Sequence, residues 1–184
     1  GGFVGIGEPS AILNGGRFFQ MADVLGVDKE LGFSLSSDKY FKTKLEKHFI
    51  TEDVNSKFDF GESIKNIYAN SESTEIIEIQ NDDVLMSANS YGKGRAVYIA
   101  GLPYSAQNAR LLMRSCYYAA NKEEHLKEWY CDNIYCEVSA YIESNKYAVI
   151  NNSNEKQKTN VYDGFKNIFE VDLEPAEIRW FEIK

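Results

Sequence analysis

The sequence predicts an α/β domain followed by an all-β domain. Residues 1–121 combine short apolar runs, typical of buried strands, with two stretches in which apolar residues recur at helical spacing. Residues 122–184 instead contain short aromatic and β-branched segments separated by turn residues, with no convincing helical pattern. We therefore place a domain boundary after residue 121 and expect the second domain to be a small β-sandwich.

The first domain is expected to open with a strand and a helix. Phe3 to Ile6 is an apolar run, and a glycine-containing loop separates it from a helical pattern that begins at Phe18 and stops at Gly26. A strand this apolar needs neighbours on both edges, and a natural chain rarely begins inside one. We therefore expect the sequence to be part of a longer polypeptide.

A polar excursion and three strands are expected to follow. Residues 28–60 are rich in Lys and Asp and have only weak periodicity, so we expect a surface excursion with a short helix at 40–48. The apolar runs beyond it predict strands at 74–79, 84–89 and 95–100, the last two joined by a hairpin turn at 91–94.

A longer helix is expected to close the first domain. Ser105 is a good N-cap, and the helical pattern runs from it to about Ala120. The residues expected to line its buried face are Ala109, Leu112, Cys116 and Ala119. Arg110 and Arg114 are interpreted as solvated or paired surface charges.

Five strands are expected in the second domain, after a polar connector at 121–124. They are predicted at 136–142, 147–151, 159–162, 168–171 and 178–183, with turns at 143–146 and 153–156.

Composition excludes several classes of function. The net charge of −8 and the scattered basic residues disfavour nucleic-acid binding, and no apolar run is long enough to cross a membrane. The three cysteines are expected to be reduced. A zinc site at Cys131 and Cys136 lacks further ligands nearby, because the only histidines, His48 and His125, stand alone.

The loop after the first strand carries the candidate contact residues. The run from Gly5 to Ser10 begins like a dinucleotide-binding loop, but Ser10 replaces its third glycine and Pro9 removes a backbone donor. A tight turn at the carboxyl end of a strand is the simpler interpretation. Open α/β sheets bind ligands at such ends, so Glu8 and Ser10 are candidate ligand contacts, with nucleotide binding as an alternative.

Several long runs of the sequence resemble the 1,3-β-galactosyl-N-acetylhexosamine phosphorylases, also called lacto-N-biose phosphorylases. The runs are GGFVGIGEPSA (1–11), GRFFQMADVLGVD (16–28), ELGFSLSSDKY (30–40), GKGRAVYIAGLPYS (92–105), RLL (110–112) and LEPAEIRWFEI (173–183). The resemblance implies that residues 1–121 are the C-terminal part of a central, glutamine-amidotransferase-like α/β domain, and that residues 122–184 are a C-terminal β domain.

The resemblance also implies an activity for the parent protein. The family cleaves galactosyl-β-1,3-N-acetylhexosamine with phosphate, with inversion, to α-galactose 1-phosphate and N-acetylhexosamine. An Asp in an N-terminal barrel, outside this sequence, protonates the glycosidic oxygen. We therefore expect no catalytic residue in this sequence and no cofactor, with inorganic phosphate as the co-substrate of the parent. We also expect the parent to be a cytoplasmic homodimer in which this chain packs against the barrel.

Two alternatives to this function remain open. The chain could be a stand-alone module that binds carbohydrate or protein, in which case exposed aromatic residues of the second domain would form the surface; the candidates are Trp129, Tyr130, Tyr135 and Tyr141. A nucleotide-binding α/β domain is the other alternative. The amidotransferase likeness imports no amidotransferase chemistry, because no nucleophile is visible and a fold alone does not carry function.

Overall fold

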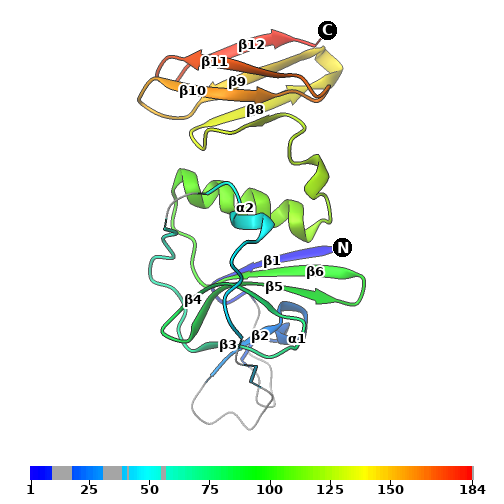
Figure 1. Cartoon of the computed structure of the whole chain (residues 1–184), viewed down its shortest axis with the longest axis vertical. Helices are drawn as coiled ribbons and strands as arrows, with labels where there is room; N and C mark the ends of the chain where they lie inside the picture. The colour runs from blue at the N-terminus through cyan, green and yellow to red at the C-terminus, as the bar shows by residue number, and fades with distance from the viewer. Residues whose placement is uncertain (10–17, 31–38, 41, 55–56, 184) are drawn as a thin grey trace. The chain divides into compact units, whose positions relative to one another are not determined.

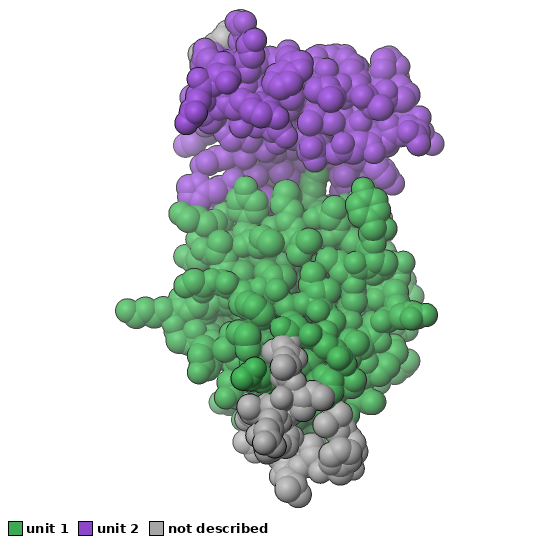
Figure 2. Space-filling model, turned by 180° about the vertical axis from the view of Figure 1, so that it is seen from behind, with its two compact units in different colours: residues 1–123 green, residues 124–184 purple. Residues whose placement is uncertain are grey.

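The computed structural model describes residues 1–9, 18–30, 39–40, 42–54 and 57–183. It divides into two compact units, Gly1–Glu123 and Glu124–Lys184, which Figure 2 shows in green and purple. Both units are built mainly from β-sheet. The described residues contain two α-helices, and both belong to the first unit.

A four-stranded sheet forms the centre of the first unit. Its strands run in the order β1 (Gly2–Ile6), β6 (Gly94–Ile99), β5 (Asp83–Tyr91) and β4 (Glu75–Gln80). The pair β1–β6 is parallel, whereas β6–β5 and β5–β4 are antiparallel. All four strands were expected from their apolar runs, and the turn between β5 and β6 is confirmed as a hairpin.

A smaller sheet of two short strands was not expected. It pairs β2 (Val27–Lys29) with β3 (Ile67–Ala69), and its edge continues through a bridge between Tyr40 and Ala69. Strands of only three residues give almost no periodic signal. The expected surface excursion at 28–60 contains the buried residues Asp28, Ile50 and Phe60, so it is not wholly a surface segment.

The prediction of a helix at 40–48 is wrong. Among its described residues, the backbone N–H of Tyr40 donates to the carbonyl of Ala69 at 3.0 Å, and that of Leu45 donates to Ile76 at 2.8 Å. These bonds tie the segment to neighbouring strands, and the weak periodicity offered no apolar face that could favour a helix. The only helical turn nearby is a 3₁₀ turn, η1 (Phe49–Thr51), among the residues described.

The first helix, α1 (Ala22–Leu25), is shorter than the pattern predicts. Its expected stop is confirmed, because Gly26 has φ +72° and forms a left-handed C-cap. Its expected start at Phe18 is wrong. The N–H of Phe19 donates to the buried Asp28 carboxylate at 2.8 Å, which holds this residue outside the helix.

The second helix, α2 (Ala106–Ala119), begins where expected but buries a different face. The Ser105 hydroxyl accepts from the N–H of Asn108 at 3.1 Å, so the N-cap is confirmed. Ala109 and Cys116 are exposed, contrary to the expected face. The buried residues are Asn108, Arg110, Leu111, Arg114, Ser115 and Ala119. Hydrogen bonds and ion pairs engage the polar side chains of this face, although Asn108 Oδ1 has no partner among the described residues, and apolar spacing alone could not reveal these contacts.

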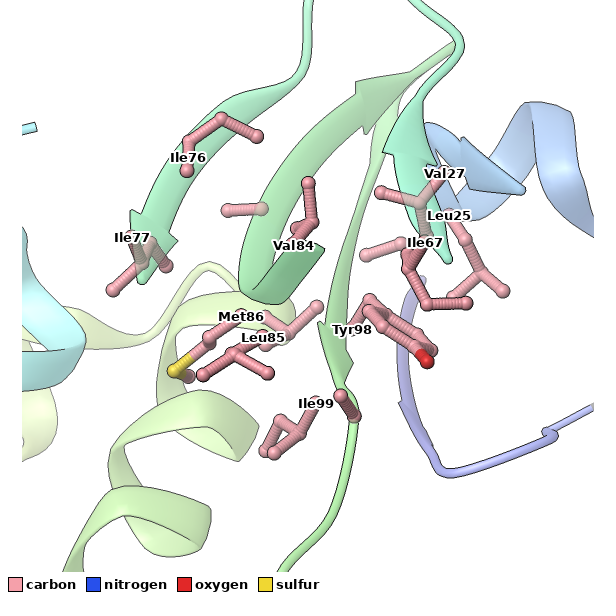
Figure 3. Packing of buried hydrophobic residues seen from close by; sticks show 14 of the residues in the cluster. Leu25, Val27, Ile67, Ile76, Ile77, Val84, Leu85, Met86, Tyr98 and Ile99 are labelled. Carbon is pink, nitrogen blue, oxygen red and sulfur yellow. The ribbon is translucent and has the colours of Figure 1, made fainter. Parts of the chain in front are cut away.

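The two faces of the central sheet are covered by different elements. In Figure 1, α2 lies over one face, while α1 and the β2–β3 pair lie over the other. The approach of α2 is close, since a Cβ added to Gly2 would stand 2.0 Å from the carbonyl oxygen of Ala119. Figure 3 shows the apolar core, in which residues of α1, β2 and β3 meet those of β4, β5 and β6.

The second unit consists of two three-stranded antiparallel sheets, consistent with a small β-sandwich. One sheet has the order β11-β10-β7 and the other β12-β9-β8. The strands are β7 (Tyr130–Cys131), β8 (Cys136–Tyr141), β9 (Lys146–Asn151), β10 (Gln157–Tyr162), β11 (Ile168–Leu173) and β12 (Ile178–Glu182). The buried core includes Val149 from one sheet and Val161 and Leu173 from the other. The five expected strands are confirmed, and only the two-residue β7 was missed.

Candidate functional site

The loop after β1 forms a tight turn at the carboxyl end of the parallel pair. Gly7 has φ +67°, and its N–H donates to the carbonyl of Ile99 on β6 at 2.8 Å. The Tyr98 hydroxyl donates to the Gly7 carbonyl at 3.1 Å. Burial, together with the negative charges of Glu8 and Asp83, raises the pKa of Tyr98, so this hydroxyl remains protonated. The interpretation of this loop as a tight turn is confirmed.

Of the two candidate contact residues, the structure describes only Glu8. Its carboxylate lies 3.2 Å from the Lys29 ammonium, which also stands 4.5 Å from the centre of the Phe18 ring. Ser10 lies outside the described residues. Ligand contact by Glu8 and Ser10 therefore stays a prediction.

A cleft of about 580 Å³ opens at the same end of the sheet, but on the side of β4 and β5. The register pairs Gln80 with Asp83 and Met86 with Ile99, so the β4–β5 hairpin lies beside the carboxyl end of β6. Both β4 and β5 contribute to the cleft, and segment 57–65 supplies its other wall. Its lining includes Lys44, Lys57, Phe58, Phe60, Ser63 and Lys65.

Hydrogen bonds hold segment 57–65 in place. The N–H of Ile64 donates to the carbonyl of Ala100 at 3.0 Å, just beyond β6. The Asn108 amide, at the start of α2, donates to the carbonyl of Asp59 at 2.9 Å. The sequence interpretation missed this cleft, because the segment lies at the end of the polar stretch. The alternation of Lys, Phe and Asp at 57–60 was the available signal.

Arg110 and Arg114 are paired, but they are not surface charges. Only 6% and 3% of these residues is exposed. One oxygen of Asp53 lies 3.1 Å from a guanidinium nitrogen of each arginine, and the Arg114 Nε–H donates to the carbonyl of Phe49 at 2.6 Å. The two arginines therefore fasten segment 49–53 to α2, which is a structural role.

His48 lies beside this arginine cluster and is largely buried. Its Nδ1 accepts from the N–H of Ile50 at 3.2 Å, while its Nε2 lies 3.5 Å from the Glu75 carboxylate. Burial lowers the pKa of His48, Arg114 and Arg95 lower it further, and Glu75 opposes them. His48 is therefore neutral at pH 7.

Stability is expected to fall as the pH drops below about 6.5, the pKa of an unfolded histidine. In that range the unfolded chain binds a proton at position 48 that the folded chain resists, because the folded pKa is lowered. Replacing His48 by Asn keeps a capping side chain and removes the titration. The free energy of unfolding of wild type and of His48→Asn can be measured by denaturation at several pH values across this range. We expect it to fall less with decreasing pH in His48→Asn than in wild type. An equal fall in both proteins would contradict a lowered pKa of His48.

The aromatic candidates of the second unit divide into core and surface residues. Tyr130 is buried, and Trp129 packs on Tyr147 and Phe165 with ring centres 5.1 and 5.9 Å apart. Tyr135 and Tyr141 are exposed. Tyr141 lies 5.5 Å from Trp180, which is 56% exposed and was not among the candidates.

The residues that the structure describes hold no group of three His, Cys, Asp or Glu side chains that could bind a metal ion. No helix in the described part of the chain is long and apolar enough to cross a membrane.

The two-part organisation of the chain is matched by two family models. Residues 1–124 match the lacto-N-biose phosphorylase central domain, and residues 129–181 match the lacto-N-biose phosphorylase C-terminal domain. This is the domain order of one class of sugar phosphorylases. The chain belongs to the lacto-N-biose phosphorylase family, as its sequence resemblance implied.

Curated relatives align along the chain. A 1,3-beta-galactosyl-N-acetylhexosamine phosphorylase of Lachnoclostridium phytofermentans is 47% identical over 183 residues, covering 100% of this chain and 25% of that protein. Its namesake from Bifidobacterium longum subsp. longum is 39% identical, covering 99% and 28%. A D-galactosyl-beta-1->4-L-rhamnose phosphorylase of L. phytofermentans is 32% identical, covering 86% and 21%. The chain thus spans about a quarter of the length of these relatives.

A weaker likeness links the chain to a solved structure. The β-galactosidase of Bacillus circulans sp. alkalophilus aligns with a TM-score of 0.44 at 14% identity, over 98% of this chain and 29% of that one. A TM-score this low does not establish a shared fold.

Proposed function

We propose that this chain is the central and C-terminal part of a phosphorylase that cleaves galactosyl-β-1,3-N-acetylhexosamine. The observation that carries the proposal is the 47% identity along the whole chain with a protein of that name. The relative named for a galactosyl-rhamnose substrate is only 32% identical. The N-acetylhexosamine acceptor is therefore the better supported choice.

In the proposed reaction, phosphate replaces the N-acetylhexosamine at C1 of galactose. An oxygen of inorganic phosphate attacks C1 from the face opposite the glycosidic bond, and the bond from C1 to the glycosidic oxygen breaks. An Asp of an N-terminal barrel supplies a proton to the leaving oxygen. The products are α-galactose 1-phosphate and the free N-acetylhexosamine, and no covalent enzyme intermediate or further cofactor is required.

The proposed role of this chain in that enzyme is non-catalytic. The first unit would complete an amidotransferase-like central domain that packs against the barrel, in a cytoplasmic homodimer. The engagement of the candidate groups within the fold supports a structural role. Arg110 and Arg114 are held by Asp53, and Glu8 is held by Lys29.

The assignment is tested by incubating the parent enzyme with galactosyl-β-1,3-N-acetylglucosamine, with and without phosphate. We expect α-galactose 1-phosphate only when phosphate is present, with the α configuration visible by NMR. Release of free galactose without phosphate would identify a hydrolase. Formation of β-galactose 1-phosphate would contradict inversion.

A carbohydrate-binding surface on the second unit is a second candidate function. It is favoured by the exposed pair of Tyr141 and Trp180, because exposed aromatic rings can pack against the C–H faces of sugar rings. Titration with a β-1,3-linked galactoside should change the fluorescence of wild type, and Trp180→Ala should abolish saturable binding. The absence of saturable binding to wild type would remove this candidate.

A further inference from the structure

The cleft between segment 57–65 and the strands β4 and β5 carries an excess of positive charge. Three lysines line it, Lys44, Lys57 and Lys65, against two carboxylates, Asp59 and Glu78. This balance is the reverse of the whole chain, whose net charge is −8. A cleft with net positive charge attracts small anions, even though the protein as a whole is acidic.

Two of the three ammonium groups are available to a ligand. Lys44 forms an ion pair with Glu78, so its charge is compensated. Lys65 donates to the Ser63 hydroxyl at 3.2 Å, which is a neutral partner. Within the described ranges, neither Lys57 nor Lys65 has a carboxylate partner, and both residues are exposed.

The wall that carries Lys57 and Lys65 is held by the sheet and by α2. Its bonds to Ala100 and to Asn108 are described above, and Asp59 accepts from the N–H of Gly61 at 2.8 Å. A Cβ on Gly101 would stand 2.2 Å from the carbonyl oxygen of Phe60, so this wall lies directly against the end of β6. A wall fixed in this way positions its side chains before any ligand arrives.

The cleft has room for more than a bare anion. Its volume of about 580 Å³ falls within the range typical of small-molecule sites, roughly 300–1,000 Å³. Phe58, Phe60 and Leu85 supply apolar surface, while Ser63 and Gln80 supply groups that can bond to hydroxyls. The strand residues that line it come from the antiparallel pair β4–β5, at the end of the sheet where β6 also ends.

We propose that this cleft binds a phosphorylated sugar, with Lys57 and Lys65 contacting the phosphate and the sugar ring packing on Phe58. The choice of α-galactose 1-phosphate as the probe rests on the proposed function, whereas the cleft, its charge and its position do not.

Calorimetric titration of the full chain with α-galactose 1-phosphate tests the proposal. We expect saturable binding that weakens as salt is raised, because exposed charges are screened. In the Lys57→Gln/Lys65→Gln double variant, we expect the affinity to fall by about tenfold or more. Both positions are exposed, so the variant should fold normally. The matched control is Lys93→Gln, in the turn at the opposite end of β6, which should bind like wild type.

Three comparisons can overturn the proposal. Inorganic phosphate binding as tightly as the sugar phosphate would show that the sugar is not recognised, and free galactose binding as tightly would show that the phosphate is not. No saturable binding of α-galactose 1-phosphate would also reject the site. If the parent enzyme is active but the cleft does not bind α-galactose 1-phosphate, only the proposed binding site is rejected. If the cleft binds it but the parent enzyme is inactive, only the proposed reaction is rejected.

Discussion

Replacing Arg114 by Ala is expected to lower the free energy of unfolding of the first unit by about 3–5 kcal/mol, the usual cost of breaking a buried ion pair. The Arg114 side chain is only 4% exposed. It donates to the carbonyl of Phe49, contacts Asp53 at 3.1 Å and lies over the Phe49 ring at 4.2 Å. Its loss would leave the Phe49 carbonyl without this donor, and Asp53 would keep Arg110 but lose one of its two guanidinium partners.

The position of the tryptophans allows each unit to be followed separately. The chain contains two tryptophans, Trp129 and Trp180, and both lie in the second unit. Tryptophan fluorescence therefore reports the second unit, whereas far-ultraviolet dichroism also reports the first. In Arg114→Ala, we expect the dichroism transition to begin at a lower denaturant concentration and the amides of α2 to exchange hydrogen faster. The control is Lys44→Ala, which removes an ion pair with Glu78 at an exposed position and should cost less than about 1 kcal/mol. Equal losses of stability in the two variants would contradict the assignment of Arg114 as a buried side chain that holds segment 49–53 on α2.

Replacing Leu173 by Ala is expected to lower the free energy of unfolding of the second unit by about 2–5 kcal/mol, through lost apolar contact and the cavity that remains. Leu173 is fully buried in the sandwich core. A domain of about 60 residues has a total stability of roughly 3–9 kcal/mol. The substitution should therefore remove much of the stability of this unit.

Tryptophan fluorescence during denaturation measures this loss. The matched control is Ile168→Ala on the same strand, β11, because Ile168 is 61% exposed. We expect little change for this control, since its side chain leaves no cavity. Similar midpoints for Leu173→Ala and wild type would contradict the sandwich core.

The strands could be predicted because their apolar runs are long enough to produce a pattern. The nine-residue β5 and the five main strands of the second unit are examples. The three-residue β2 and β3 could not be predicted, because their pairing depends on residues far apart in the chain. The buried face of α2 was misjudged since Asn108 and Arg114 are buried by hydrogen bonds and ion pairs, which apolar spacing does not register.

The candidate site was predicted only in its general position. The apolar run before it placed Glu8 at the carboxyl end of a strand, and the structure confirms that position. The cleft at the same end of the sheet is lined by residues of β4, β5 and segment 57–65, and only the fold brings these together. The alternation at 57–60 marks one wall of the cleft, but no motif links it to Lys44 or to the strands β4 and β5.

The most direct measurement compares this chain and the parent enzyme side by side, at equal concentration, for phosphate-dependent release of α-galactose 1-phosphate from galactosyl-β-1,3-N-acetylglucosamine. Folding of the chain is verified first by its tryptophan fluorescence and far-ultraviolet dichroism. We predict activity in the parent only, because the proposed acid and sugar contacts belong to the barrel. Release of α-galactose 1-phosphate by the chain alone would contradict the central claim that these two units are not catalytic.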